Sequence, residues 1–97
     1  MPSREEIVVK IRALKPLLRQ RYKATGFELF GSRARAEDKD ESDIDILVDF
    51  EEGADLLHLV GLSIFLEEQL KGKIDVVPRR ALREELRESI LRQAIPI

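Results

Sequence analysis

Two short strand-like segments flank one long apolar segment, and this order restricts the fold more than any other feature of the chain. The segment DIDILVDF at residues 43–50 alternates Ile and Val with other residues, as a half-buried β-strand does. The segment KIDVVP at residues 73–78 predicts a second strand, closed by proline. Residues 55–70 between them predict a helix that is apolar almost all round and ends near Gly72. A strand–helix–strand crossover favours a parallel, right-handed pairing of the two strands.

The remaining segments extend this unit to a small α/β fold. Residues 3–22 predict an amphipathic helix with a capping box at its start and a kink or a second helix start at Pro16. The FELF segment at residues 27–30 predicts a short strand, and its tight link to the next strand favours antiparallel pairing. Residues 81–94 predict a last helix. We therefore expect a single domain over residues 1–97, with a small mixed three-stranded sheet flanked by helices.

The composition excludes several classes of function. The chain has no cysteine and one histidine, His58, so disulfides, thiolate metal sites and histidine-based zinc sites are excluded. The net charge of −2 gives no strong electrostatic footprint for nucleic acid. The most apolar run, LLHLVGLSIFL, is too short to span a bilayer, and the first residues lack a signal-peptide pattern. We expect a cytoplasmic protein without a membrane partner.

Two carboxylates stand one residue apart in a predicted strand, although Asp is a poor strand former. Side chains alternate along a strand, so Asp43 and Asp45 point to the same face, with their Cα atoms roughly 6.5–7 Å apart. Their repulsion requires a compensating charge, and a hard dication such as Mg²⁺ accepts carboxylate ligands. Asp75 lies near the start of the parallel partner strand. Three acids are thus expected to form one cluster, able to hold two metal ions roughly 3.5–4 Å apart.

A phosphate-binding element is predicted beside these acids. Antiparallel pairing of the first two strands would bring Gly31 and Ser32 next to the acid pair. A glycine lets a phosphate approach the backbone closely, and a helix start at the serine would attract anions. Arg33 and Arg35 are close enough in sequence to neutralise phosphate charge. A cation site and an anion site at one place suit a magnesium–nucleoside triphosphate complex.

Each feature has a simpler explanation when taken alone. Acids on an edge strand protect against aggregation, and Gly-Ser pairs are common in turns. We interpret the other acids near this segment as surface residues and His58 as partly buried or at an interface. We expect a solvated patch, with contact to a phosphate or an acidic partner as the lesser alternative, from three basic residues: Arg79, Arg80 and Arg83. The joint order of strand, Gly-Ser, strand, Asp-x-Asp, helix, strand and Asp favours the nucleotide site.

The stretch GSRARAEDKDESDIDILVDF resembles the signature of the minimal nucleotidyltransferases of the DNA polymerase β superfamily. That signature is Gly-Ser, ten residues, then Asp-x-Asp, and residues 31–32 and 43–45 fit it without a gap. Asp75 matches the third acid of the family, and Ala36 replaces a glycine that members commonly carry in the linking turn. The resemblance covers about residues 7–95 and implies a polymerase-β-type nucleotidyltransferase palm.

The resemblance also implies a function and a set of roles. Stand-alone members resemble antitoxins that move AMP from ATP to a tyrosine of a helical HEPN-domain ribonuclease toxin. By this resemblance two Mg²⁺ ions are held by three catalytic acids: Asp43, Asp45 and Asp75. By the same resemblance Gly31 and Ser32 hold the β- and γ-phosphates, and either Arg33 or Arg35 stabilises the charge on the leaving pyrophosphate.

Two alternatives remain open at the level of sequence. The chain could be a binding module that blocks a toxin by covering it, since the apolar helix over residues 55–70 has more apolar surface than one sheet face needs. An aminoglycoside-type transferase is disfavoured because no acceptor-binding domain accompanies the motif. We expect the chain to associate with itself or with a helical partner through this helix or its neighbours.

Overall fold

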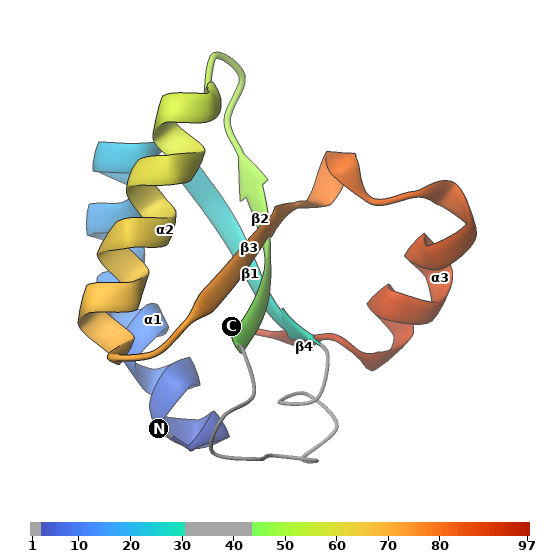
Figure 1. Ribbon diagram of the computed structural model, residues 1–97, viewed down its shortest axis with the longest axis horizontal. Helices are drawn as coiled ribbons and strands as arrows, with labels where there is room; N and C mark the ends of the chain where they lie inside the picture. Colours follow the sequence, from blue (N-terminus) through green and yellow to red (C-terminus); the bar gives the residue numbers. More distant parts are fainter. Residues whose placement is uncertain (1–2, 31–43) are drawn as a thin grey trace.

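The computed structural model describes residues 3–30 and 44–97. Along the chain these residues form α1 (Arg4–Tyr22), β1 (Ala24–Phe30), β2 (Ile44–Phe50), α2 (Leu56–Leu70), β3 (Ile74–Pro78), the 3₁₀ helix η1 (Arg79–Ala81), α3 (Glu84–Gln93) and β4 (Ile95–Pro96). Figure 1 shows α1 and α2 running side by side in opposite directions. No helix of the described residues is long and apolar enough to cross a membrane.

The sheet is mixed, with strand order β3-β2-β1-β4. The antiparallel pairing of β1 with β2 and the parallel pairing of β2 with β3 confirm the two predicted pairings. The prediction of three strands is wrong, because β4 pairs with β1 through Glu28↔Pro96 and Leu29↔Ile95. A two-residue strand is too short to show the alternation by which strands are recognised in a sequence.

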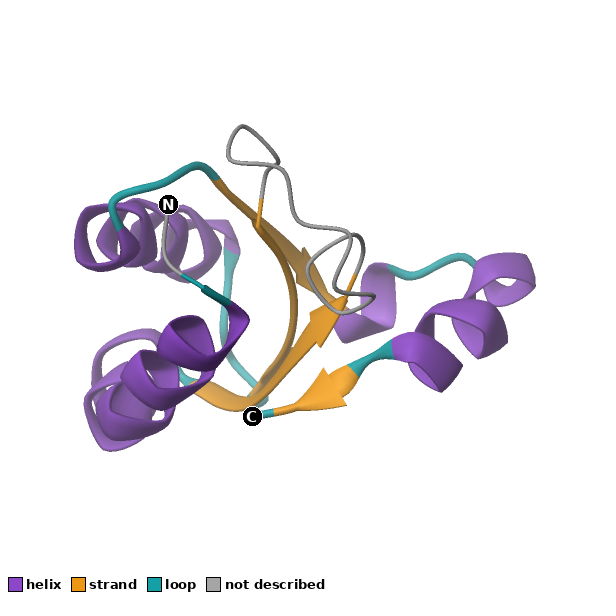
Figure 2. Cartoon of the chain, turned by 90° about the horizontal axis from the view of Figure 1, so that it is seen from below, coloured by secondary structure: helices purple, strands orange, loops and turns teal. Residues whose placement is uncertain are grey.

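The helices α1 and α2 cover one face of the sheet, and α3 stands beyond the other face (Figure 2). Ile44, Ile46 and Val48 of β2 alternate toward the helix pair and are buried, whereas Leu47, on the other face, is buried as well. The resulting core unites both helices with β1, β2, β3 and the residue after β4, and includes Ile7, Ile11, Leu18, Phe27, Leu29, Ile44, Ile46, Val48, Leu62, Leu66, Leu70, Ile74 and Ile97.

The first helix ends where it was predicted to end, but it differs from its prediction at Pro16. It runs without interruption through Pro16, so the second helix start is wrong. It ends at Tyr22 because Lys23 adopts the left-handed conformation, and the Lys23 N–H is donated to the carbonyls of Arg19 and Leu18. The strand that follows then begins at Ala24 rather than at Phe27.

The later helices follow the sequence more closely. Asp55 is the N-cap of α2, as its predicted start requires, whereas the left-handed C-cap is Lys71 and not Gly72. The last helix starts at Glu84, later than predicted, because η1 occupies the preceding segment. Part of α2 is apolar and exposed, as its all-round apolar character predicted, at Leu56, Leu57, Val60 and Ile64.

Candidate active site

The candidate site is built on the second residue of each of two parallel strands. Asp45 in β2 and Asp75 in β3 are direct partners in the strand register. Neighbouring strands lie about 4.8 Å apart, and partners in register project from the same face. Ile44 and Ile46, on either side of Asp45, are fully buried under the helix layer. Both acids therefore project from the opposite face, where Asp75 is exposed and Asp45 is half-buried.

The end of β1 lies next to this acid pair. Phe30, the last residue of β1, is the register partner of Asp45 on its other side. The predicted antiparallel arrangement thus brings the end of the first strand to the start of the second. The other five residues predicted for the site lie outside the described part of the chain: Gly31, Ser32, Arg33, Arg35 and Asp43.

The chemistry of the two described acids fits a divalent metal ion. Like charges directly opposite each other on neighbouring strands are destabilising, so a cation between them is favourable. Carboxylate oxygens are the ligands that Mg²⁺ prefers. Within residues 3–30 and 44–97, no group of three or more His, Cys, Asp or Glu side chains is placed to hold a metal. Asp45 and Asp75 supply two of the three predicted ligands, and Asp43 is not among these residues.

A second charged cluster, which the sequence did not predict, joins η1 to the sheet. Arg79 forms ion pairs with Glu28 of β1 and with Asp49 of β2. Arg79 Nε lies 3.1 Å from Asp49 Oδ1 without forming a hydrogen bond to it. The Arg79 side chain is 30% exposed and that of Glu28 only 14%. The prediction of a solvated arginine patch is therefore wrong for Arg79.

A glycine makes room for this cluster. A Cβ atom added to Gly26 would lie 2.9 Å from Asp49 Oδ2, closer than real contacts allow. Gly26 is also the register partner of Asp49 in the neighbouring strand. A sequence signal was present in Glu28, a charged residue between the apolar Phe27 and Leu29 of a short strand. Glu28 alone does not indicate which cation pairs with it, because Arg79 lies far along the chain.

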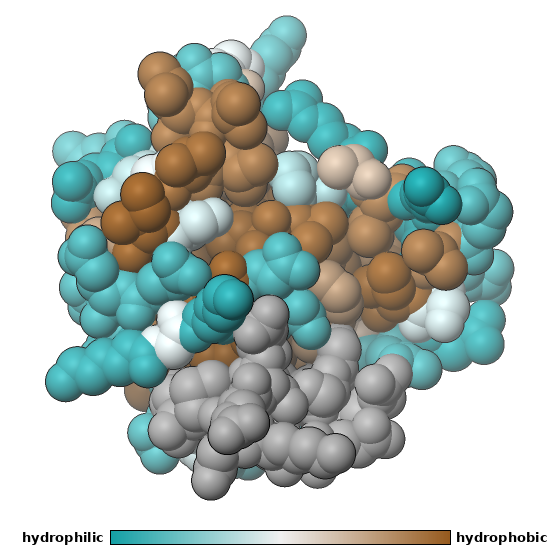
Figure 3. Space-filling view, viewed as in Figure 1, coloured by the Kyte–Doolittle hydropathy of each residue, from teal (hydrophilic) through white to brown (hydrophobic). Residues whose placement is uncertain are grey.

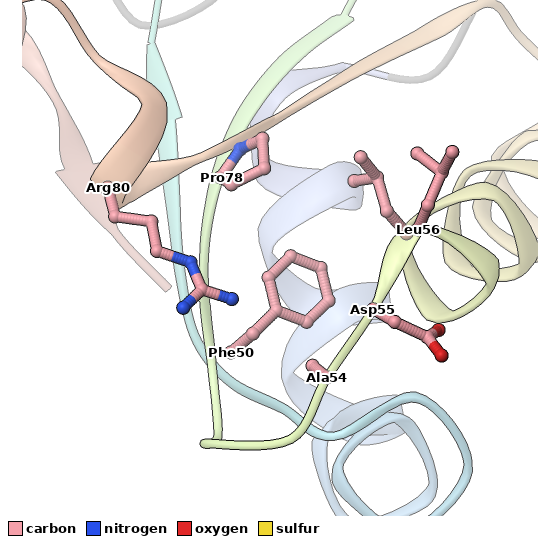
Figure 4. Close-up of a pocket in the computed structure, with 7 residues that line it drawn as sticks. Phe50, Ala54, Asp55, Leu56, Pro78 and Arg80 are labelled. Carbon is pink, nitrogen blue, oxygen red and sulfur yellow. The ribbon is translucent and has the colours of Figure 1, made fainter.

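A cavity of about 230 Å³ lies at the other end of these strands. It is lined by Phe50, Ala54, Asp55, Leu56, Leu59, Pro78 and Arg80. Figure 4 shows the ring of Phe50 between Arg80 on one side and Leu56 on the other. Phe50 and Pro78 end β2 and β3, whereas the acid pair stands near the start of both strands. The cavity is therefore separate from the candidate site.

The sheet of this chain is mixed, with helices α1 and α2 on one face and two carboxylates paired across its parallel strands on the other. The class of the protein follows from comparison with known proteins. The family model of the nucleotidyltransferase domain matches residues 11–97, and the chain belongs to this family of enzymes. Nucleotidyltransferases use a nucleoside triphosphate and a divalent metal ion.

The similar proteins have related descriptions. The protein adenylyltransferase MntA of Thermococcus cleftensis is 38% identical over 95 residues, which cover 98% of this chain and 96% of that protein. A solved structure described as a minimal nucleotidyltransferase has a TM-score of 0.85 and 40% identity, covering 99% of this chain and 97% of that one.

A more distant similarity is to one chain of a complex. The complex is of a tri-AMPylated Shewanella oneidensis HEPN toxin with an MNT antitoxin, and the TM-score is 0.66 at 24% identity. The alignment covers 93% of this chain and 70% of that chain. At this level of identity the similarity shows the fold alone.

Proposed function

We propose that the chain is a protein adenylyltransferase antitoxin, which transfers AMP from ATP to a hydroxyl group, that of a tyrosine, on a HEPN-domain toxin and so inactivates it. The observation that carries the proposal is the direct register of Asp45 with Asp75 on the face of the sheet that the helix layer leaves free. The name of the Thermococcus cleftensis relative and the AMPylated toxin in the Shewanella oneidensis complex support the choice of nucleotide and acceptor.

The reaction is an in-line displacement at the α-phosphorus of ATP. The acceptor oxygen forms a bond to this phosphorus while the bond to the bridging oxygen of the β-phosphate breaks, and pyrophosphate leaves. Asp75 takes the proton of the attacking hydroxyl. Asp43, Asp45 and Asp75 would hold Mg²⁺, two ions by the family resemblance, which supplies positive charge against the charge that develops on the phosphate oxygens.

The remaining residues bind and orient the triphosphate. Gly31 and Ser32 hold the β- and γ-phosphates, since a glycine backbone allows close approach. Arg33 or Arg35 neutralises the charge on the leaving pyrophosphate. Catalysis then consists of positioning and electrostatics, as in other phosphate transfers. The acceptor protein supplies the wall that excludes water from the reacting atoms.

One observation favours a second function, in which the chain inactivates the toxin by covering it. Leu57 at 80% exposure and Ile64 at 52% exposure give α2 an apolar surface of the kind that binds proteins. Steric masking requires no metal and no nucleotide. The two functions therefore differ in whether the carboxylates are needed.

The test compares the wild-type chain with Asp45→Asn and Asp75→Asn. Each is mixed with Mg²⁺, ATP and a HEPN-domain toxin, and the mass of the toxin is followed over time. We expect Asp75→Asn to keep most of the ATP affinity and to lose transfer by roughly 100-fold or more, because proton transfer in the transition state contributes at least this much. Asp45→Asn should lose both.

Glu52→Gln is the control, because it changes an exposed carboxylate that belongs neither to the candidate site nor to the Arg79 cluster. It should transfer AMP at nearly the wild-type rate. If the variant with Asn at both Asp45 and Asp75 still inactivates the toxin, and no AMP is attached, masking is the function and the adenylyltransferase proposal fails.

A further inference from the structure

The helix α3 contributes little to the core of its own chain. None of the residues of α3 is buried, and Leu86 is 51% exposed. Its remaining apolar residues, Ile90 and Leu91, are only half-buried. A helix of ten residues is marginal in water by itself, because helices in proteins are stabilised mainly by packing an apolar face. Contacts within the chain therefore supply only part of the packing that can stabilise α3.

The chain nevertheless holds α3 firmly at both ends. On the amino-terminal side, Arg79 of η1 binds the carboxylates of Glu28 and Asp49. On the carboxyl-terminal side, β4 pairs with β1, and the N–H of Ile97 is donated to the carbonyl of Phe27 at 2.9 Å. The segments on both sides of α3 are thus bound to the sheet, although no residue of α3 itself is buried. We infer that these contacts, the two anchors of α3, fix its position.

The position of α3 relates it to the candidate site. Figures 1 and 2 place α1 and α2 on one side of the sheet and α3 on the other, the side from which Asp45 and Asp75 project. Figure 3 shows apolar side chains gathered on the α3 part of the molecule, next to the apolar edge of the sheet. Asp75 and α3 therefore lie on the same side of the sheet, the side from which an acceptor hydroxyl group would reach Asp75.

We propose that the apolar side of α3, centred on Leu86, is the surface on which the acceptor protein docks while it presents its hydroxyl group. The inference rests on the proposed function for the identity of the acceptor, but it concerns binding and not transfer. The acceptor is favoured over a second copy of this chain because α3 flanks the reaction face. An interface between copies there would obstruct the approach to Asp75.

Calorimetric titration with the HEPN-domain toxin, in the absence of ATP, tests the docking surface. We expect Leu86→Asp to weaken toxin binding at least tenfold, because it places a charge in an apolar contact. Ile64→Asp is the matched control: the two residues are 51% and 52% exposed, on opposite sides of the sheet. Ile64→Asp should bind the toxin as the wild type does. Circular dichroism checks that both variants fold.

A kinetic measurement separates docking from chemistry. In the transfer reaction, Leu86→Asp should raise the KM for the toxin at least tenfold while the KM for ATP stays unchanged. Wild-type binding by Leu86→Asp, lost binding by Ile64→Asp, or no binding by the wild-type chain would each overturn the docking proposal. Toxin that binds through Leu86 but never receives AMP would instead refute the proposed adenylyltransferase and leave the docking surface in place.

Discussion

The sheet face opposite α1 and α2 has two pairs of carboxylates, and single residues determine how each pair is held. The acid pair Asp45 and Asp75 is held in register by backbone pairing, and no arginine among the described residues forms a salt bridge with Asp75. Glu28 and Asp49, by contrast, share one cation, Arg79. The chain thus neutralises Glu28 and Asp49 by itself, whereas Asp45 and Asp75 are the carboxylates that we propose to hold a metal ion.

At the residue scale we predict that Arg79→Met destabilises the protein by about 1–3 kcal/mol, because it leaves two partly buried carboxylates without their cation. Urea unfolding measures this loss. Hydrogen exchange should also become faster in α3 than in α2, since one anchor of α3 is lost. Arg80→Met is the control, because Arg80 is exposed and forms no ion pair with the described residues. Equal effects of the two substitutions would contradict the assigned role of Arg79.

Among the elements, α2 is the one whose start is set most clearly by a local interaction. Asp55 accepts a hydrogen bond from the backbone N–H of His58, and His58 Nδ1 accepts one from the backbone N–H of Asp55. The first of these bonds is the main cause that holds the pKa of Asp55 below its ordinary value, with the side chain of His58 contributing further. The carboxylate form of Asp55 is therefore the form that caps the helix.

The sign of the resulting pH dependence follows from this shift. Because the pKa of Asp55 is lowered on folding, its stabilisation is present above the ordinary value of 3.8 and is lost as the pH falls through the lowered pKa. Asp55→Asn should keep the cap and lose this acid-dependent component, while Asp55→Ala should be less stable at every pH. Thermal melts from neutral to strongly acidic pH, with Glu52→Gln as control, test it. An unchanged acid dependence in Asp55→Asn would exclude the assignment.

The elements also show what the sequence can predict. The start of α2 and the parallel pairing of β2 with β3 were predicted, because an apolar pattern and a crossover rule are local properties of residues 43–78. The antiparallel pairing of β1 with β2 was predicted from the tight link between the two strands. The start of β1 at Ala24 was not predicted, since the left-handed lysine that precedes it leaves no signal in composition. The link from Arg79 to Glu28 and the pairing of β4 depend on contacts between distant segments. The meeting of acids at the starts of β2 and β3 was predicted because it follows from parallel pairing, whereas the exact register of Asp45 with Asp75 was not.

At the scale of the whole molecule, the last residues of the chain return to its first strand. Ile97 belongs to the core and is 8% exposed, whereas Ile95 is half-buried and only packs against that core. Leu86, between the two anchors of α3, is half exposed. A buried isoleucine thus follows α3 in the sequence and packs into the core. The helix α3 itself extends away from the core (Figure 1).

This arrangement predicts a graded response to three alanine substitutions, measured by urea unfolding. Ile97→Ala should cost about 2–4 kcal/mol, because it removes a buried side chain and leaves a cavity. Ile95→Ala should cost less, and Leu86→Ala should stay within about 0.5 kcal/mol of the wild type, as exposed positions do. A cost at Leu86 equal to that at Ile97 would mean that α3 is part of the core. A small cost at Leu86 combined with weakened toxin binding would mean that its apolar surface is completed by the acceptor.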